Sequence, residues 1–221
     1  MDSERIEHII GLADFRGCIR IDCGSRPVLA KAYGYADLAN KISNTLETKF
    51  ATASAGKVFV AVAVLRLIEH GRLSLQDTIG KILPIDWHGI DREITVEQLL
   101  THTSGIPDYF DESVLKEYEE LWQDFPNYRV RTNADLLPLF INKPMMYPRG
   151  TRFQYNNTGF VVLAMMIEAV TGQPFDACLK ANVFDRCGMD STGYYELDCL
   201  PAKCANSYIF DGEKDRFRTN I

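Results

Sequence analysis

Apolar residues dominate two stretches of the sequence, and polar residues end each of them sharply. The first stretch follows Lys57 and continues to Ile68, where Glu-His-Gly71 stops it. The second covers residues 158–170 and is followed by Gly172. A run of about 14 residues is too long for a strand, and apolar side chains on nearly all faces indicate a buried helix. We therefore predict two central helices, each ended by a glycine.

The remaining pattern predicts one β-hairpin and several shorter helices. Residues 17–23 and 27–35 have the composition of two strands, joined by a Gly-Ser-Arg-Pro turn. Further helices are predicted at 3–12, after a Thr95–Gln98 capping box, after a cap at Asn133, and at about 175–185. Residues 107–133 are charged and aromatic and are predicted to be partly irregular. The fold class is therefore mixed, with an early hairpin followed mostly by helices.

Charge and hydropathy exclude several classes of partner. The net charge is −6 and no basic cluster stands out, which argues against a nucleic-acid partner. No stretch reaches the roughly 18 apolar residues of a membrane span. The N-terminal sequence MDSERIEHII lacks a basic start and an apolar core, so no export signal is visible. We expect a cytoplasmic protein, unless a signal has been removed.

The six cysteines do not form a recognisable metal-binding pattern. They stand at positions 18, 23, 178, 187, 199 and 204, and no histidine lies near either Cys-x4-Cys pair. His8, His70 and His88 are scattered and have no metal-ligand spacing. We expect reduced, mostly buried thiols, with no metal and no cofactor.

Ser54 and Lys57 combine an alcohol and an amine at the start of the first apolar stretch. Residues three apart lie on the same face of a helix, so the amine is expected beside the hydroxyl. A lysine in apolar surroundings gives up its proton more readily, and such a lysine activates a serine nucleophile. The alternative is a serine helix cap and a solvated lysine. A second S-x-x-K, Ser113 and Lys116, stands among acidic residues, where nothing is expected to desolvate the lysine.

Tyr155 and Asn157 form the only Y-x-N in the chain, directly before the second apolar stretch. In an extended segment alternate side chains point the same way, so a phenol and an amide can face one cleft. There the phenol can move a proton and the amide can hold a substrate. The alternative is that Asn157 caps the helix and Tyr155 packs on the core. An α/β-hydrolase elbow G-x-S-x-G is absent, because Thr52 occupies the position of its first glycine.

Together these motifs resemble the serine β-lactamase and penicillin-binding protein superfamily. The residues that carry the resemblance are Ser54-Ala-Gly-Lys57, Tyr155-Asn-Asn157 and LLTHTSGIPDY at 99–109. The nearest branch is the class C β-lactamase, DD-peptidase and esterase group, in which Y-x-N replaces S-D-N. The resemblance implies an antiparallel sheet flanked by helices and a mostly helical region. It also implies a structural role for His102 at the end of a helix.

The resemblance implies a division into 1–50 (helix and hairpin), 51–200 (helical, with both motifs) and 201–221 (the start of a C-terminal part). No K-T-G or H-x-G, the third motif of the family, occurs in the chain. We therefore expect a truncated member that lacks the C-terminal strands and is weakly active, and whose unpaired hairpin self-associates.

The implied function is a serine hydrolase acting on an amide, ester or lactam carbonyl of a small molecule or peptide. Ser54 is the nucleophile, Lys57 and Tyr155 move the proton, and Asn157 orients the substrate. Whether Lys57 or Tyr155 is the base stays open. The alternative is a non-catalytic penicillin-binding or sensing module that is acylated without turnover.

Overall fold

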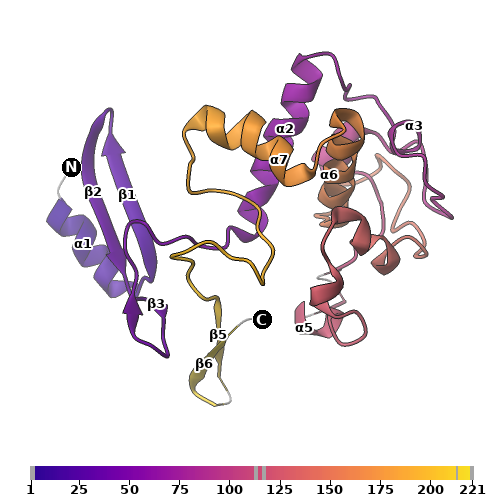
Figure 1. The fold of residues 1–221 in the computed structure, drawn as a ribbon. Helices are drawn as coiled ribbons and strands as arrows, with labels where there is room; N and C mark the ends of the chain where they lie inside the picture. Colours follow the sequence, from indigo (N-terminus) through magenta and orange to yellow (C-terminus); the bar gives the residue numbers. More distant parts are fainter. Residues whose placement is uncertain (1–2, 112–113, 116–117, 213, 220–221) are drawn as a thin grey trace. The chain divides into compact units, whose positions relative to one another are not determined.

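The computed structural model describes residues 3–111, 114–115, 118–212 and 214–219, and the chain divides into two compact units. The first unit comprises Met1–Ala53 and Tyr195–Ile221, and the second is Ser54–Tyr194. Figure 1 shows the elements of both. The second S-x-x-K, Ser113 and Lys116, lies outside the described residues.

The first unit contains the strands. Its elements are α1 (Ser3–Leu12), β1 (Gly17–Cys23), β2 (Arg26–Tyr33), β3 (Tyr35–Asp37), β4 (Ile42–Ser43), β5 (Tyr208–Asp211) and β6 (Arg216–Thr219). Consecutive strands form three antiparallel pairs, β1–β2, β3–β4 and β5–β6. The predicted helix at 3–12 and the predicted hairpin are thus present. The single strand predicted at 27–35 is wrong, because Gly34 has a φ of +70° and separates β2 from β3.

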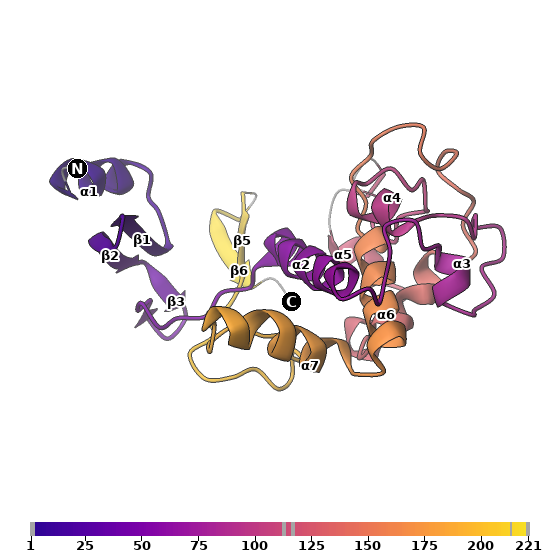
Figure 2. The ribbon, with the colours of Figure 1, turned by 90° about the horizontal axis from the view of Figure 1, so that it is seen from above.

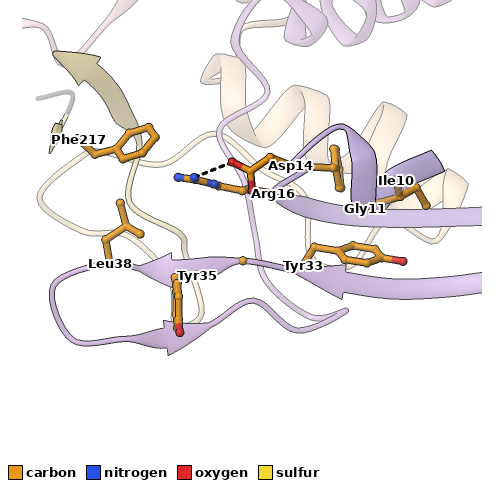
Figure 3. Close-up of a pocket in the computed structure, with 10 residues that line it drawn as sticks. Ile10, Gly11, Asp14, Arg16, Tyr33, Tyr35, Leu38 and Phe217 are labelled. Atoms are coloured by element: carbon orange, nitrogen blue, oxygen red, sulfur yellow. Dashed lines mark hydrogen bonds and ion pairs between the residues drawn. The ribbon is translucent and has the colours of Figure 1, made fainter. Parts of the chain in front are cut away.

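A cavity of about 570 Å³ lies within the first unit (Figure 3). Residues of α1, of the segment after it, of β2 and β3, and of β6 line this cavity. Arg16 lies inside it, with its guanidinium 3.0 Å from the Asp14 carboxylate and 4.5 Å from the centroid of the Phe217 ring. None of the residues predicted to be catalytic lines this cavity.

The second unit contains the long helices and the hydrophobic core. Its elements are η1 (Ala53–Gly56, which begins in the last residue of the first unit), α2 (Lys57–Glu69), α3 (Ile79–Ile82), α4 (Val96–Leu100), α5 (Tyr118–Leu121), η2 (Asn127–Arg129), η3 (Asn133–Leu139), α6 (Thr158–Thr171), α7 (Phe175–Leu179), η4 (Lys180–Phe184) and η5 (Asp185–Cys187). Helix α6 packs against α2, α3, α4, α7 and η3 (Figure 2). Most of its residues are buried, as its unbroken apolar sequence predicts.

Local sequence signals explain where these helices begin and end. Helix α2 is followed by Gly71 at a φ of +65°, and α6 ends at Gly172 at +70°, so both predicted glycine stops are confirmed. The capping box of Thr95 and Gln98 begins α4, as predicted. The expected cap at Asn133 is wrong. Thr132 takes that position, because its side chain forms a capping box with Asp135.

Two further predictions needed correction. The helix expected at about 175–185 changes hydrogen-bonding pattern, from α to a π-helical turn and then a 3-10 turn. The cysteines are free thiols, but only Cys178 is buried, whereas Cys23, Cys187 and Cys199 are exposed. In the first unit the cysteines lie on short strands and loops, which present many of their side chains to solvent.

No single helix among the described residues is long and apolar enough to cross a membrane. Two helical segments, Thr158–Thr171 and Phe175–Cys187, reach the length and apolar composition of a membrane span only when they are taken together, and the chain bends by 81° between them. The first of the two is the buried core helix α6.

Candidate active site

Ser54 and Lys57 lie side by side at the start of the first long helix. Ser54 is in the 3-10 turn η1, and Lys57 is the first residue of α2. The Lys57 Nζ atom donates to the Ser54 Oγ atom at 3.2 Å. The proximity expected from their spacing is therefore present. Ala53, directly before the serine, has a φ of +45°, a conformation that is costly for a residue with a Cβ atom and that is often found at functional sites.

The Y-x-N segment meets this pair from a distant part of the sequence. The Tyr155 hydroxyl donates to Ser54 Oγ at 2.6 Å, and Lys57 Nζ donates to Asn157 Oδ1 at 2.9 Å. The Lys57 ammonium also lies 4.8 Å from the centroid of the Tyr155 ring, within the range of a cation–π interaction. All four residues predicted to be catalytic are thus brought together in the second unit.

Lys57 has neutral partners in this arrangement. Its hydrogen-bond acceptors are a hydroxyl and an amide oxygen, and no ion pair to it is found in the part of the chain that the structure describes. An amide oxygen accepts a hydrogen bond from lysine without adding a negative charge. The amine is therefore oriented by its surroundings and directed at the serine.

The site is open on the side of the serine and closed behind the amide. Ser54 is exposed and Tyr155 is 37% exposed, whereas Asn157 is only 5% exposed. Helix α6 begins directly after Asn157, so the buried amide sits where the core helix starts. A substrate carbonyl can approach the serine hydroxyl from solvent, while the groups behind it are held by the core.

His102 packs against the segment that carries the Y-x-N. Its ring lies against Tyr155, with 4.7 Å between ring centroids, and against Phe160, with 5.2 Å. Its Nδ1 atom accepts a hydrogen bond from the Asn156 backbone N–H at 3.1 Å, so Nδ1 carries no proton. Burial, together with the charge of Lys57, lowers the pKa of His102. A neutral His102 therefore holds the segment that carries the Y-x-N.

Asp108 is a residue of this site that the sequence reasoning missed. It is 5% exposed, and its carboxylate accepts hydrogen bonds from Asn157 and Thr158. The residue lies in the stretch 99–109 that helped to define the resemblance, but an isolated aspartate in a loop has no local pattern that marks it. The available signal was a single acidic residue in the apolar context Gly-Ile-Pro-Asp-Tyr.

Among the described residues, no cluster of three or more histidine, cysteine, aspartate or glutamate side chains is placed so that it could hold a metal ion.

Comparison with known proteins places the chain in a family. Residues 23–220 match the Beta-lactamase family, so the chain belongs to it. The crystal structure of a penicillin-binding protein from Bacillus halodurans is similar, with a TM-score of 0.90 and 38% identity over 97% of this chain and 64% of that one. The resemblance inferred from the motifs is confirmed, and so is the fold class.

Two further relatives extend the comparison. Penicillin-binding protein 4* of Bacillus subtilis (strain 168) is 26% identical over 92% of this chain and 44% of its own length. The octameric penicillin-binding protein homologue from Pyrococcus abyssi has a TM-score of 0.79 and 28% identity, over 99% of this chain and 50% of that one. The chain spans about half the length of the curated relatives it matches.

Proposed function

We propose that the chain is a serine hydrolase that acts on an amide, ester or lactam carbonyl through an acyl-serine intermediate. The observation that carries this proposal is the position of the Ser54 Oγ atom, 3.2 Å from Lys57 Nζ and 2.6 Å from the Tyr155 hydroxyl. A serine hydroxyl needs a nearby group to take its proton before it can attack, and both of these groups are within reach. Membership of the Beta-lactamase family supports the same chemistry.

In the first step Ser54 Oγ forms a bond to the substrate carbonyl carbon, and its proton passes to the deprotonated member of the Lys57–Tyr155 pair. The carbonyl oxygen becomes an oxyanion, for which the Ser54 backbone N–H is one donor. The tetrahedral intermediate then expels the nitrogen or oxygen leaving group, which takes the proton from the same pair. In the second step water attacks the acyl-serine and releases the acid, which regenerates the Ser54 hydroxyl.

Asn157 is proposed to orient the substrate and Lys57 together. Its Oδ1 atom holds Lys57 Nζ at 2.9 Å, and its side chain lies at the inner wall of the site. Its NH₂ group is engaged by Asp108 and the Phe110 carbonyl, so the group it offers a substrate is the amide oxygen, which has a second lone pair to accept a substrate N–H.

Hydrolysis of a chromogenic ester and of a chromogenic cephalosporin tests this proposal. We expect steady release of product from at least one substrate by the wild-type chain, and none above background from Ser54→Ala. Equal rates from the two proteins would exclude Ser54 as the nucleophile.

The second candidate function is a penicillin-binding or sensing module that is acylated without turnover. The observation that favours it is that the similar proteins include penicillin-binding proteins, among them the one from Bacillus halodurans at 38% identity. A burst of one product per protein molecule, followed by no further release, would support this candidate. Many turnovers per molecule would exclude it.

We also propose that the chain associates with further copies of itself through the β1–β2 hairpin. The hairpin forms a two-stranded sheet among the described residues, so the outer edges of β1 and β2 are available for pairing. Light scattering after size exclusion, over a range of protein concentrations, is the test. A monomer at every concentration would contradict the proposal.

A further inference from the structure

Asp108 holds a buried carboxylate that accepts hydrogen bonds from several donors at once. Its Oδ2 atom accepts from the Asn157 backbone N–H at 2.9 Å and from Asn157 Nδ2 at 3.3 Å. Its Oδ1 atom accepts from the Thr158 N–H at 3.1 Å, from the Thr158 hydroxyl at 3.2 Å and from the Phe110 N–H at 3.4 Å. No ion pair to this carboxylate is found among the described residues, so these hydrogen bonds offset the cost of burying its charge.

The carboxylate takes over the capping of helix α6. Asn157 occupies the N-cap position, yet its side chain makes no capping hydrogen bond. The Asn157 and Thr158 N–H groups donate to Asp108 instead. An anion is favourable at a helix N-terminus, where the free N–H groups and the helix dipole are both positive. Because Asp108 caps the helix from another segment, the Asn157 side chain is free to hydrogen-bond elsewhere.

Asp108 also determines which way the Asn157 amide faces. The amide nitrogen lies 3.3 Å from Asp108 Oδ2 and 3.4 Å from the Phe110 carbonyl oxygen, both of which only accept. The amide oxygen lies 2.9 Å from the Lys57 ammonium, which only donates. Rotating the amide by 180° would set oxygen against oxygen and nitrogen against nitrogen. One orientation alone satisfies all three neighbours.

We propose that Asp108 is a positioning residue, which fixes the Asn157 amide so that its oxygen holds Lys57 beside the Ser54 hydroxyl. The inference rests on the proposed function, because it takes Ser54 and Lys57 as the reacting pair. Asp108 touches neither of them and acts through Asn157. The Asp108 carboxylate accepts a hydrogen bond from the Asn157 amide nitrogen, and the amide oxygen accepts one from the Lys57 amine.

The charge of Asp108 is part of this role. Burial raises the pKa of its carboxyl, and the N–H groups of Asn157, Thr158 and Phe110 oppose that rise. Those donors hydrogen-bond to the ionised form and so favour it. A neutral amide at this position has only one accepting atom, and it would present a donor to at least one of the two backbone N–H groups that begin the helix.

The test compares acylation by a fluorophosphonate in the wild-type chain and in four variants of it. Asp108→Asn removes the charge and one acceptor, and we expect acylation of Ser54 to slow by about 10²-fold, the cost of displacing a reacting group by about 1 Å. Thr158→Val is the matched control. It removes the hydroxyl that donates to the same carboxylate and accepts from the Tyr109 backbone N–H, but it leaves the Asn157 contacts. The other two chains are Asn157→Ala and Asp108→Asn combined with Asn157→Ala. In the Asn157→Ala background, Asp108→Asn should add little further loss.

A purely structural role predicts a different pattern. In that case Asp108→Asn would slow acylation by the same factor with and without the Asn157 side chain, and that result would overturn the proposal. Circular dichroism shows whether each variant is folded. Should Asp108→Asn fail to fold, Asp108→Ser replaces it, since a serine hydroxyl still accepts a backbone N–H but carries no charge.

A second readout does not depend on activity. Hydrogen exchange of the Asn157 side-chain NH₂, assigned by its loss in Asn157→Ala, should be slow in the wild-type chain and in Thr158→Val. It should be fast in Asp108→Asn. Unchanged exchange in Asp108→Asn would overturn the inference even if Ser54 reacts normally. A wild-type chain that is not acylated would contradict the proposed function, and the exchange measurement alone would then decide the role of Asp108.

Discussion

Tyr155 donates a hydrogen bond to the Ser54 hydroxyl at 2.6 Å, although 101 residues separate the two in the sequence. The contact joins the turn before α2 to the segment before α6, the two apolar helices of the core. Since the start of each helix is fixed by its packing, the phenol and the alcohol are held together without a covalent link. The site is thus built at the N-terminal ends of two helices that pack against each other.

Replacing Lys57 should remove most of the reactivity of the serine. Lys57→Met keeps the length of the side chain but has no proton acceptor or donor for Ser54, and general acid–base catalysis contributes about 10²–10⁴-fold. We expect acylation by a fluorophosphonate to fall within that range. The control is Lys116→Met, which alters the other S-x-x-K of the chain and should leave the rate unchanged. Equal losses in both variants would show that the effect is not specific to the site.

The Tyr155 hydroxyl can be tested apart from its ring. Tyr155→Phe keeps the ring that lies 4.7 Å from His102 and 4.8 Å from the Lys57 ammonium, and removes only the hydrogen bond to Ser54. We predict a loss of about 10²–10⁴-fold in hydrolysis, with the melting temperature little changed. Tyr128→Phe, at a tyrosine that is 69% exposed, is the control. A Tyr155→Phe chain as active as the wild type would leave Lys57 as the sole carrier of the proton.

His102 should make stability depend on pH. Its pKa is lowered in the folded chain by burial and by the charge of Lys57, whereas a histidine in the unfolded chain has a pKa of about 6.5. Below that pH the unfolded chain binds a proton that the folded chain does not, so the free energy of unfolding falls as pH decreases toward the folded pKa. Above about pH 6.5 this contribution is constant. Chemical denaturation of the wild type at pH 7.5 and 5.5 should show the fall.

The variant that tests this is His102→Asn, because asparagine tolerates the backbone φ of +57° at this position. It should show a smaller fall in stability between the two pH values than the wild type. His88→Asn is matched to it, since His88 has a φ of +49° but an exposed side chain. The His88 variant should keep the pH dependence of the wild type. Identical behaviour of the two variants would contradict the assignment to His102.

Gly105 is needed because a backbone carbonyl lies directly against it. Its φ is +68°, and a Cβ atom there would stand 2.1 Å from the Tyr147 carbonyl oxygen. Gly71 has a similar φ of +65°, with nothing within 4 Å of its Cβ position. Gly71→Ala should therefore lower the free energy of unfolding only by the cost of the left-handed conformation, about 1–2 kcal/mol. Gly105→Ala should lower it by about 1–3 kcal/mol more, because the added Cβ atom overpacks the site. Denaturant unfolding measures both, and equal losses would contradict the predicted clash.

The sequence alone predicted the local features, which involve residues only a few positions apart in the chain. The i, i+3 placement of Ser54 and Lys57, the glycine stops at Gly71 and Gly172, and the Thr95 capping box are local features, and the structure contains them. The meeting of Ser54 with Tyr155 was implied only by resemblance to a family, because no local periodicity relates residues so far apart.

The missed features are those in which a distant segment competes with a local one. Asn157 stands at a helix start and has the side chain of a cap, but Asp108, 49 residues earlier, performs the capping. The cap expected at Asn133 differs for a local reason, because Thr132, the preceding residue, forms a capping box with Asp135. Residue type shows that a cap is available, and only the tertiary contacts show which group is used.

Mapping a covalent adduct shows directly whether Ser54 is the nucleophile. The wild-type chain is incubated with a fluorophosphonate, digested, and analysed by peptide mass spectrometry, with Ser54→Ala and Ser113→Ala alongside. We predict one adduct per chain, on the peptide that contains Ser54. It should be present in the wild type and in Ser113→Ala and absent from Ser54→Ala. An adduct on Ser113, or a Ser54 peptide that stays unmodified in the wild type, would contradict it.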